Sequence, residues 1–579
     1  MFRKKIIILA IFLVSLVMLS AVSAADDATS DIVSLDEDLD VYADGILANN
    51  PDTFTNLNTT INGNNNSEIN LNLDYAYTDG DSSFKDGIEI TRDLTINGNG
   101  HIIDGKNQSR IFKISGCNVI LKDIYFVNGN CDSMGGAIST NGGNVTISHC
   151  YFVNNSATRG GGAVYFKNCI ADISNCFFIG NSANGSVSNY GGGAIISMYS
   201  ELTFSNSDFE NNICIDGGGG VADLIQETNA TFSNCNFVKN KAGYNGGVLH
   251  FYYLAKIYSG KNCIISNCNF KDNCGRSGGA ISFNCISFAR VLNTNFVNNF
   301  AILGGGAAFG GSNFSVEDIQ FLYCNFVNNT SNRTDFGGGA LGYCYSLFCN
   351  FTGNHAEANA GAIYMGYVSK CIFKDNTAKL EGNDTYNTTI IKLDTQLSSS
   401  AVTTVFNGGK YLTITLKDSY GNPISGVKVS VVLNGKAFTP TTDKNGQAKV
   451  STDGFAPKAY DAAITFAENV DYLKSTKSVK VTVKKATPKL TAAKKTFKAK
   501  AKTKKYAITL KTNQNKAMKS TKVYLKVKKI TYVAKTNSKG KATFKITKLT
   551  KKGKFSATIT YKGDKNYNKV TKKATITVK

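Results

Sequence analysis

The chain has 579 residues, 15 cysteines, no tryptophan and a formal net charge of +22 at pH 7. An odd number of cysteines does not fit a complete disulfide framework, and after residue 25 no segment is long or apolar enough to cross a bilayer. The charge is unevenly divided: residues 485–579 hold 30 Lys, no Arg and one acid, so they carry +29 and the remainder carries −7.

Residues 1–25 are typical of a secretory signal. Basic residues at 3–5 precede an apolar run over 6–19, and small residues at 22–24 provide a cleavage site. An uncleaved N-terminal anchor is the alternative, and in both cases the bulk of the chain leaves the cytoplasm. We therefore expect a secreted protein at the cell surface or cell wall, with no membrane span in the mature chain.

Residues 26–96 are predicted to form an acidic leader, an N-terminal cap and the first strands. Phe54, Leu57 and Ile61 have the i, i+3, i+7 spacing of an amphipathic helix. An uncapped solenoid end would expose strand edges and core, so we interpret this helix as the lid. Asp104 precedes a glycine, which favours a turn-forming role over a catalytic or calcium-binding one.

A ten-copy repeat organises residues 97–390. Its fullest form reads I-S-N-C-N-F-x-x-N, followed by a variable gap and G-G-A-I. A period of this size indicates stacked supersecondary units, none of which buries enough apolar surface to fold alone. The marker phenylalanines are 22 to 33 residues apart, at Phe126, Phe152, Phe178, Phe209, Phe237, Phe270, Phe296, Phe326, Phe351 and Phe373.

A cysteine two residues before the marker Phe shares its inward face, because side chains alternate along a strand. We interpret these cysteines as small apolar core residues kept as free thiols, since stacked neighbours lie farther apart than a disulfide prefers. No CxxC pair indicates a metal site, and no cofactor is expected. The column comprises Cys150, Cys176, Cys235, Cys268, Cys324, Cys349 and Cys371.

An Asn column marks a corner between two short strands of each copy. The apolar residue five positions before the Phe would point to the opposite face of a straight strand, because side chains alternate. It can point inward only if the chain bends between the two positions. Asn tolerates the left-handed conformation that a sharp bend requires. Stacked corner side chains are expected to form amide ladders. The corner residues are Asn175, Asn206, Asn234, Asn267 and Asn293. The repeat thus predicts an all-β fold, a right-handed parallel β-helix of about ten coils.

Gly-Gly-Ala-Ile segments, as at 135–138 and 278–281, are expected to open the third strand of a coil, where Gly permits close backbone approach. These GGA[IVL] and FxxN repeats resemble those of the polymorphic outer-membrane proteins and, more closely, the adhesin-like surface proteins of methanogenic archaea. The resemblance implies a cell-surface adhesin whose partners are glycans or proteins of a host or neighbouring cell. The membrane-spanning barrel that ends the polymorphic family is not expected here.

Loops of variable length on a rigid scaffold are where binding usually resides. The longest insertion, 251–262, is rich in tyrosine, and further tyrosines crowd the last coils. Tyrosine suits contacts with sugars or proteins, and a core-filling role is the alternative for each ring. The candidate ligand-binding residues are Tyr252, Tyr253, Tyr258, Tyr343, Tyr345, Tyr364 and Tyr367.

Catalysis has little support in the sequence. Polysaccharide-cleaving β-helices need paired carboxylates or a calcium-plus-base cluster, whereas acids here are scattered singly and no common catalytic or metal-binding motif is present. We assign no catalytic residue and no metal ligand. Because such sites assemble across coils, a secreted polysaccharide lyase or hydrolase is the alternative function, and a purely structural envelope protein is a third.

Two copies of a unit of about 95 residues follow, at 391–485 and 486–579. Their β-branched alternation with Asn-Gly and Lys-Gly turns is typical of a β-sandwich. Both units resemble the bacterial Ig-like modules found as stalks in surface adhesins. Neither contains cysteine, so core packing alone must hold them.

The second of these units is a concentrated cation. Such a field attracts anionic polymers and weakens with salt. Nucleic acid is not expected as the partner, because the unit lacks Arg for bidentate base contacts and the protein is exported. The preferred partner is an anionic cell-wall polymer bound by residues 485–579, with a generic solvated surface as the alternative.

Overall fold

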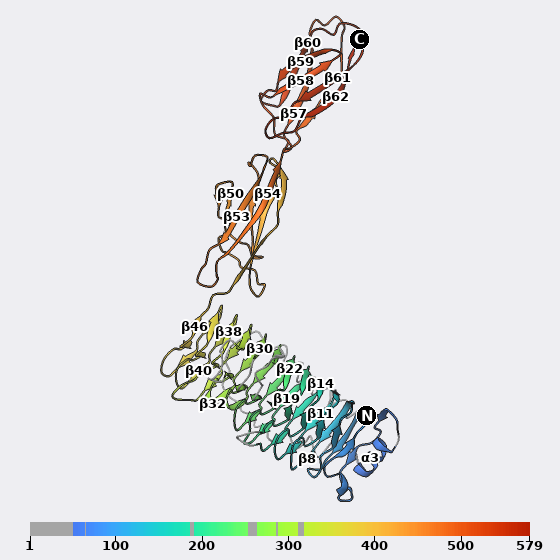
Figure 1. Cartoon of the computed structure of the whole chain (residues 1–579), viewed down its shortest axis with the longest axis vertical. Coiled ribbons are helices and arrows are strands. Elements are labelled where there is room, and N and C mark those ends of the chain that lie inside the picture. The colour runs from blue at the N-terminus through green and yellow to red at the C-terminus, as the bar shows by residue number, and fades with distance from the viewer. Residues whose placement is uncertain (1–49, 64, 186–189, 253–262, 285–287, 311–317) are drawn as a thin grey trace, which may run out of the picture. The chain divides into compact units, whose positions relative to one another are not determined.

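The computed structural model describes residues 50–63, 65–185, 190–252, 263–284, 288–310 and 318–579. The chain divides into two compact units, of which the second comprises Tyr367–Cys371 and Thr389–Lys579. The predicted secretory signal and acidic leader lie outside the described residues. The predicted all-β fold is confirmed: a parallel β-solenoid of about ten coils is followed by Ig-like β-sandwich sheets (Figure 1).

From β9 (Ile138–Asn141) on, each solenoid coil contributes four short strands to three parallel sheets. In one coil, β10 (Asn144–Ser148) and β11 (Tyr151–Val153) join a 24-stranded sheet, β12 (Ser156–Ala157) a 10-stranded sheet and β13 (Val164–Lys167) a 12-stranded sheet. The next coil repeats the register, and β11 pairs with β15 (Phe177–Ile179). The two-residue strand after FxxN was missed from the sequence, because so short a strand carries no alternation.

In the 12-stranded sheet, strands such as those starting at Ile138, Val164 and Ile281 begin directly after a Gly-Gly-Ala segment. Its strands pair with one another in succession, one from each coil. In order they are β4 (Ile88–Ile90), β6 (Phe112–Ser115), β9 (Ile138–Asn141), β13, β17 (Ile195–Met198), β21 (Ala222–Ile225), β25 (Leu249–Tyr252), β29 (Ile281–Asn284), β33 (Ala308–Gly310), β37 (Leu341–Gly342), β41 (Ile363–Tyr364) and β45 (Thr385–Tyr386).

The predicted N-terminal helix is present as α3 (Phe54–Asn62). The Thr53 side chain caps it by accepting the Asn56 main-chain N–H at 3.2 Å. All three apolar residues of the predicted pattern are fully buried, and the Phe54 ring meets Tyr77 edge-on at 5.6 Å. The helix therefore covers apolar surface that the first coil leaves open.

The marker phenylalanines form one stack through the solenoid core. Successive rings lie 4.6 to 5.1 Å apart. All but the last, Phe373, are completely buried. Burial of each such ring contributes about 1.5–3 kcal/mol, so this column is a main source of the stability that holds the coils together.

The corners combine a left-handed residue with a side-chain donor. The Cys176 thiol donates to the Ser174 main-chain oxygen at 3.2 Å, and where cysteine is absent the Ser207 hydroxyl donates to Ser205 at 2.9 Å. Burial raises the pKa of the Cys176 thiol to about 12, so it retains its proton. These cysteines thus do more than fill apolar space. The preceding corner residues have φ of 53° at Asn175, 50° at Asn206, 55° at Asn234, 54° at Asn267 and 48° at Asn293.

The continuous amide ladder runs through a column different from the expected one. The corner side chains are solvent-facing, and among them Asn234 donates to Asn206 over 3.2 Å. The buried ladder uses the Asn of FxxN, whose amide nitrogen donates both to the next amide and to the Phe carbonyl of the preceding coil. Its members are Asn155, Asn181, Asn212, Asn240, Asn273, Asn299, Asn329, Asn354 and Asn376.

The two sandwich modules have the same strand order, a three-stranded sheet packed on a five-stranded one. The first comprises β47 (Thr395–Ser399), β49 (Tyr411–Asp418) and β52 (Gln447–Ser451), with β48 (Val402–Val405), β54 (Ser475–Lys484), β53 (Lys458–Phe466), β50 (Ser430–Leu433) and β51 (Lys436–Phe438). The second comprises β55 (Lys489–Thr491), β57 (Lys504–Lys511) and β60 (Lys541–Ile546), with β56 (Lys495–Phe497), β62 (Val570–Val578), β61 (Gly553–Tyr561), β58 (Lys522–Val527) and β59 (Ile530–Lys535).

Candidate functional site

Aromatic side chains converge on the outer face of the 12-stranded sheet in the last coils. Phe309 of β33, Tyr364 of β41 and Tyr386 of β45 share one register position. Tyr364 stacks on Tyr386 with ring centroids 5.9 Å apart and planes 7° from parallel. Tyr343 meets Phe309 and Tyr364 edge-on, at 5.5 and 5.7 Å. Four rings from four coils thus form one continuous surface.

The local sequence explains how these rings meet. Gly342 of β37 occupies the shared register position between Phe309 and Tyr364. A Cβ at Gly342 would lie 2.7 Å from the Phe309 ring, so only glycine leaves room for that ring to lie over β37. The next residue, Tyr343, has φ of 56° and turns its side chain at the sheet corner.

A cation borders the rings. The Arg333 guanidinium lies 3.2 Å from the centroid of the Phe336 ring, and two of its nitrogens donate to the Asp335 carboxylate at 2.5 and 3.1 Å. Phe336 in turn lies 6.0 Å from Tyr364. We call Phe309, Arg333, Phe336, Tyr343, Tyr364 and Tyr386 the aromatic cluster.

The aromatic cluster offers apolar ring surface together with hydrogen-bond donors. Its rings are half-buried, apart from Tyr364, which is 9% exposed. Burial raises the pKa of Tyr343 and of Tyr364, so both hydroxyls remain protonated at neutral pH. Rigid rings with a polar edge and a fixed guanidinium suit contact with a sugar or a protein surface.

The structure separates the tyrosines singled out from the sequence. It brings Tyr343 and Tyr364 together, whereas Tyr345 belongs to β38 (Tyr345–Leu347) of the 24-stranded sheet and Tyr367 to β42 (Tyr367–Ser369) of the same sheet. Tyr252 packs on an apolar cluster made by Met134, Ile196, Met198 and Ile225. Tyr253 and Tyr258 lie outside the described residues.

Four members of the aromatic cluster were not found from the sequence: Phe309, Arg333, Phe336 and Tyr386. A signal existed for Phe309, because it follows Ala308 in a Gly-Gly-Ala segment and so takes the outward parity of that strand. Arg333 and Phe336 lie between strands, in a turn outside the repeat pattern. No periodic signal could have placed them.

Two buried carboxylates, those of Asp104 and Asp223, are tied into the fold. Asp104 is completely buried, and its Oδ1 accepts the Lys106 main-chain N–H at 2.7 Å, as a turn-forming residue does. Asp223 and His250 form a buried pair with Oδ1 and Nδ1 2.9 Å apart, and the other ring nitrogen lies 3.2 Å from the Asn284 amide. Within the described part of the chain no group of three metal-binding side chains occurs.

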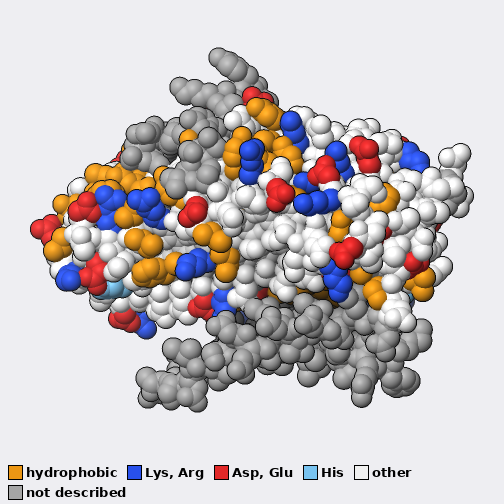
Figure 2. Space-filling view, turned by 90° about the horizontal axis from the view of Figure 1, so that it is seen from below, with side chains coloured by type: hydrophobic (Ala, Val, Ile, Leu, Met, Phe, Trp, Pro, Cys, Tyr) orange, Lys and Arg blue, Asp and Glu red, His pale blue; other side chains and the backbone are white. Residues whose placement is uncertain are grey.

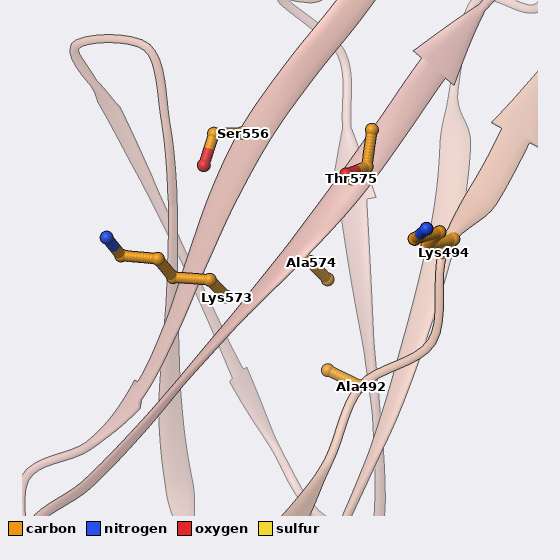
Figure 3. A pocket seen from close by; sticks show the side chains of 6 residues that line it. All are labelled: Ala492, Lys494, Ser556, Lys573, Ala574 and Thr575. Carbon is orange, nitrogen blue, oxygen red and sulfur yellow. The ribbon is translucent and has the colours of Figure 1, made fainter.

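The solenoid and the second sandwich module differ in their distribution of charge. On the described part of the face in Figure 2, side chains of Lys, Arg, Asp and Glu are interspersed. Residues 485–579 carry 30 Lys against one acid. A cleft of about 240 Å³ in this module is lined by Lys494, Ser556, Lys573 and Thr575, with Lys494 and Lys573 on opposite sides of it (Figure 3).

Comparisons with known proteins assign no function. No family model matches the chain. Metabotropic glutamate receptor-like protein R of Dictyostelium discoideum is 28% identical over 147 residues, which span 25% of this chain and 8% of that protein. Within the described residues no helix is long and apolar enough to cross a membrane.

Solved structures resemble parts of the chain, with low TM-scores. A 1.5-MDa bacterial ice-binding adhesin is 14% identical, with a TM-score of 0.16, and the match covers 34% of this chain and 69% of that one. Titin domains z1z2, solved in complex with telethonin, are 11% identical, with a TM-score of 0.20, and the match covers 33% of this chain and 98% of that one.

Proposed function

We propose that this protein is a cell-surface adhesin-like protein that binds an extracellular carbohydrate or protein through its solenoid. The observation that carries the proposal is the aromatic cluster, which gathers rings from several coils at one place on a rigid scaffold. Preorganised rings lose little conformational freedom when a ligand binds, so their contact area contributes efficiently to affinity. The two sandwich modules act as the stalk.

The lysine-rich second module supplies the attachment in this proposal. Residues 485–579 hold anionic polymers of the cell wall, while residues 1–25 direct export of the chain. The supporting observation is the density of uncompensated positive charge, +29 over 95 residues. Binding of this kind is sensitive to salt, because small ions screen the attraction.

The ligand-binding part is tested by adhesion of beads coated with the whole protein to a glycan array and to cells. The test variant is Arg333→Ala/Phe336→Ala, which removes the cation and one ring but leaves the buried core intact. Its matched control is Tyr345→Ala/Tyr367→Ala, which removes two rings from the other sheet. We expect at least about tenfold weaker binding by the test variant, since paired anchor residues contribute more than 1 kcal/mol.

The control is expected to bind as the unchanged protein does. Equal binding by all three proteins would contradict the role of the aromatic cluster, and selective loss in the control would move the site to the 24-stranded sheet. Release of unsaturated sugars from a polysaccharide would instead support the enzyme alternative. Melting curves of each variant check that the solenoid still folds.

The attachment part is tested by fractionation of cells washed with high salt. Full-length protein is compared with a chain that ends at Lys484. We expect salt to release the full-length protein and the shortened chain to be lost to the medium without salt. Equal retention of both would contradict attachment through the second module.

A further inference from the structure

We propose that the outer face of the three-stranded sheet β55–β57–β60 is a track for an extended polyanion. The proposal rests on the attachment function proposed above and specifies which surface performs it and which class of polymer it takes. Five exposed lysines project from this face, and we call them the lysine track: Lys489, Lys505, Lys511, Lys541 and Lys545.

The register of the sheet sets lysines directly against one another. Lys489 of β55 is opposite Lys511 of β57, and Lys505 of β57 is opposite Lys545 of β60. Directly opposite residues of an antiparallel pair have Cα atoms about 4.5–5.5 Å apart, and like charges in such positions destabilise a sheet. A bound anion would remove this repulsion, so the module gains stability when the track is occupied.

Among the described residues no carboxylate pairs with these lysines, and the Lys489 amino group donates to the neutral Asn515 side-chain oxygen at 2.8 Å. Between them the face carries only small or hydroxylated side chains, such as Thr491, Thr509 and Thr543. The single acid of the module, Asp564, accepts main-chain N–H groups of its own turn, and its carboxylate binds Asn566 at 2.8 Å. The positive charge on this face is therefore available to an external ligand.

The first sandwich module shows that the fold does not require these lysines. Its three-stranded sheet has the same pairing, with half-buried Leu397 opposite buried Leu416 where the second module has Leu490 opposite Leu510. This register identifies the positions equivalent to the lysine track, and only one of the five is a lysine. They are Gln396, Tyr411, Lys417, Gln447 and Ser451.

The spacing of the track selects the ligand class. Six residues separate Lys505 from Lys511 on one strand, which corresponds to about 20 Å. Lys541 lies between the two ends, opposite Thr509. A single headgroup or metabolite cannot reach both lysine pairs, whereas a polymer with repeated carboxylates or phosphates can. Ammonium groups act as point charges, so either anion satisfies them.

The experiment compares two full-length variants with equal loss of charge. The track variant replaces Lys489, Lys505, Lys511, Lys541 and Lys545 with Gln. The control variant replaces five exposed lysines associated with the cleft and the five-stranded sheet, Lys494, Lys522, Lys526, Lys535 and Lys573, with Gln. The probes are polygalacturonate, long-chain polyphosphate and monomeric galacturonate, each titrated at several salt concentrations.

We expect the track variant to bind both polymers at least about tenfold more weakly and with a shallower salt dependence, because fewer counter-ions are exchanged. The control variant should lose less than about threefold, a range set by screened long-range attraction alone. Polymers, unlike the monomer, should raise the melting temperature of the unchanged protein. The free track variant should melt no lower than the unchanged protein, since lysine repulsion is gone.

Equal losses in both variants would overturn the track and leave attachment by diffuse charge in place. A larger loss in the control would overturn the track in favour of the cleft or the five-stranded sheet. If the unchanged protein binds neither polymer at low salt, both the track and the attachment proposal fail. Tighter binding to duplex DNA than to either polymer would overturn the assigned ligand class.

Discussion

The side-chain nitrogen of Asn240 donates to the main-chain oxygen of Phe209, 2.9 Å away in the preceding coil, inside the solenoid core. The same nitrogen donates to the Asn273 amide oxygen at 3.1 Å, and the Asn240 oxygen accepts the Asn212 main-chain N–H at 2.9 Å. One buried amide thus bonds to groups of the preceding and the following coil and so links three coils. The ladder therefore fixes how each coil sits on the next.

Replacement of Asn240 with Ala should destabilise the solenoid by about 3 kcal/mol or more, because several buried polar groups lose their partner at once. The midpoint of urea unfolding, followed by circular dichroism, measures this change. Asn236→Ala is the control, since Asn236 is exposed and its side chain donates to the exposed edge of the sheet, to Asp208 Oδ1 at 2.7 Å. A similar shift in both variants would contradict the role of the ladder.

The Cys176 thiol should be replaceable by a hydroxyl but not by a methyl group. Ser207 already performs its part in the next coil, where the hydroxyl donates to the carbonyl two residues back. Cys176→Ser should change the free energy of unfolding by less than about 1 kcal/mol, whereas Cys176→Ala should cost about 1–3 kcal/mol through the unpaired carbonyl and the cavity. Urea midpoints of the two variants decide this. Equal costs would mean that the thiol only fills space.

The sequence was sufficient to predict the coil and the stacking of its phenylalanines. Both depend on the repeat period and on the alternation of side chains along each strand. Phe152 and Phe178 are 26 residues apart and pair in register, as the repeat predicts. The corner at Asn175 was located from a single change of parity. The two-residue strand Ser156–Ala157 and the buried role of Asn155 were not located, since neither leaves an alternation that distinguishes inside from outside.

The candidate site was only partly predictable, for a physical reason. Tyr343 and Tyr364 were singled out as residues, but their contact depends on the glycine at 342, which lets the Phe309 ring lie across the sheet. Arg333 reaches the aromatic cluster from a segment between strands whose length does not follow the repeat. Contacts across coils depend on side-chain direction and on loop geometry, and no repeat pattern encodes either.

Stability of the solenoid should decrease as the pH rises above 9. The pKa of the buried Cys176 thiol is raised to about 12, whereas the unfolded thiol titrates near 9.0. The folded state therefore holds a proton that the unfolded state releases between these values, and the stabilisation present below pH 9 is lost as the pH increases. From pH 8 to pH 10.5 one such thiol accounts for about 2 kcal/mol. Cys176→Ser should show a smaller decrease in urea midpoint, and an identical slope would contradict the assignment.

Gly218 and His250 provide a test of the buried pair. A Cβ at residue 218 would lie 2.2 Å from His250 Nδ1, the atom that faces Asp223. Gly218→Ala should therefore displace the imidazole and cost about 2–4 kcal/mol, as overpacking and a broken buried pair do. His250→Ala alone should also destabilise, because it leaves the Asp223 carboxyl buried without its partner.

In the His250→Ala background the methyl group at residue 218 has space, so Gly218→Ala should cost less than about 1 kcal/mol there. Urea midpoints of the two single variants and the double variant complete the thermodynamic cycle. Additive costs would show that the glycine is required by its backbone alone and that the imidazole position is not set by this contact.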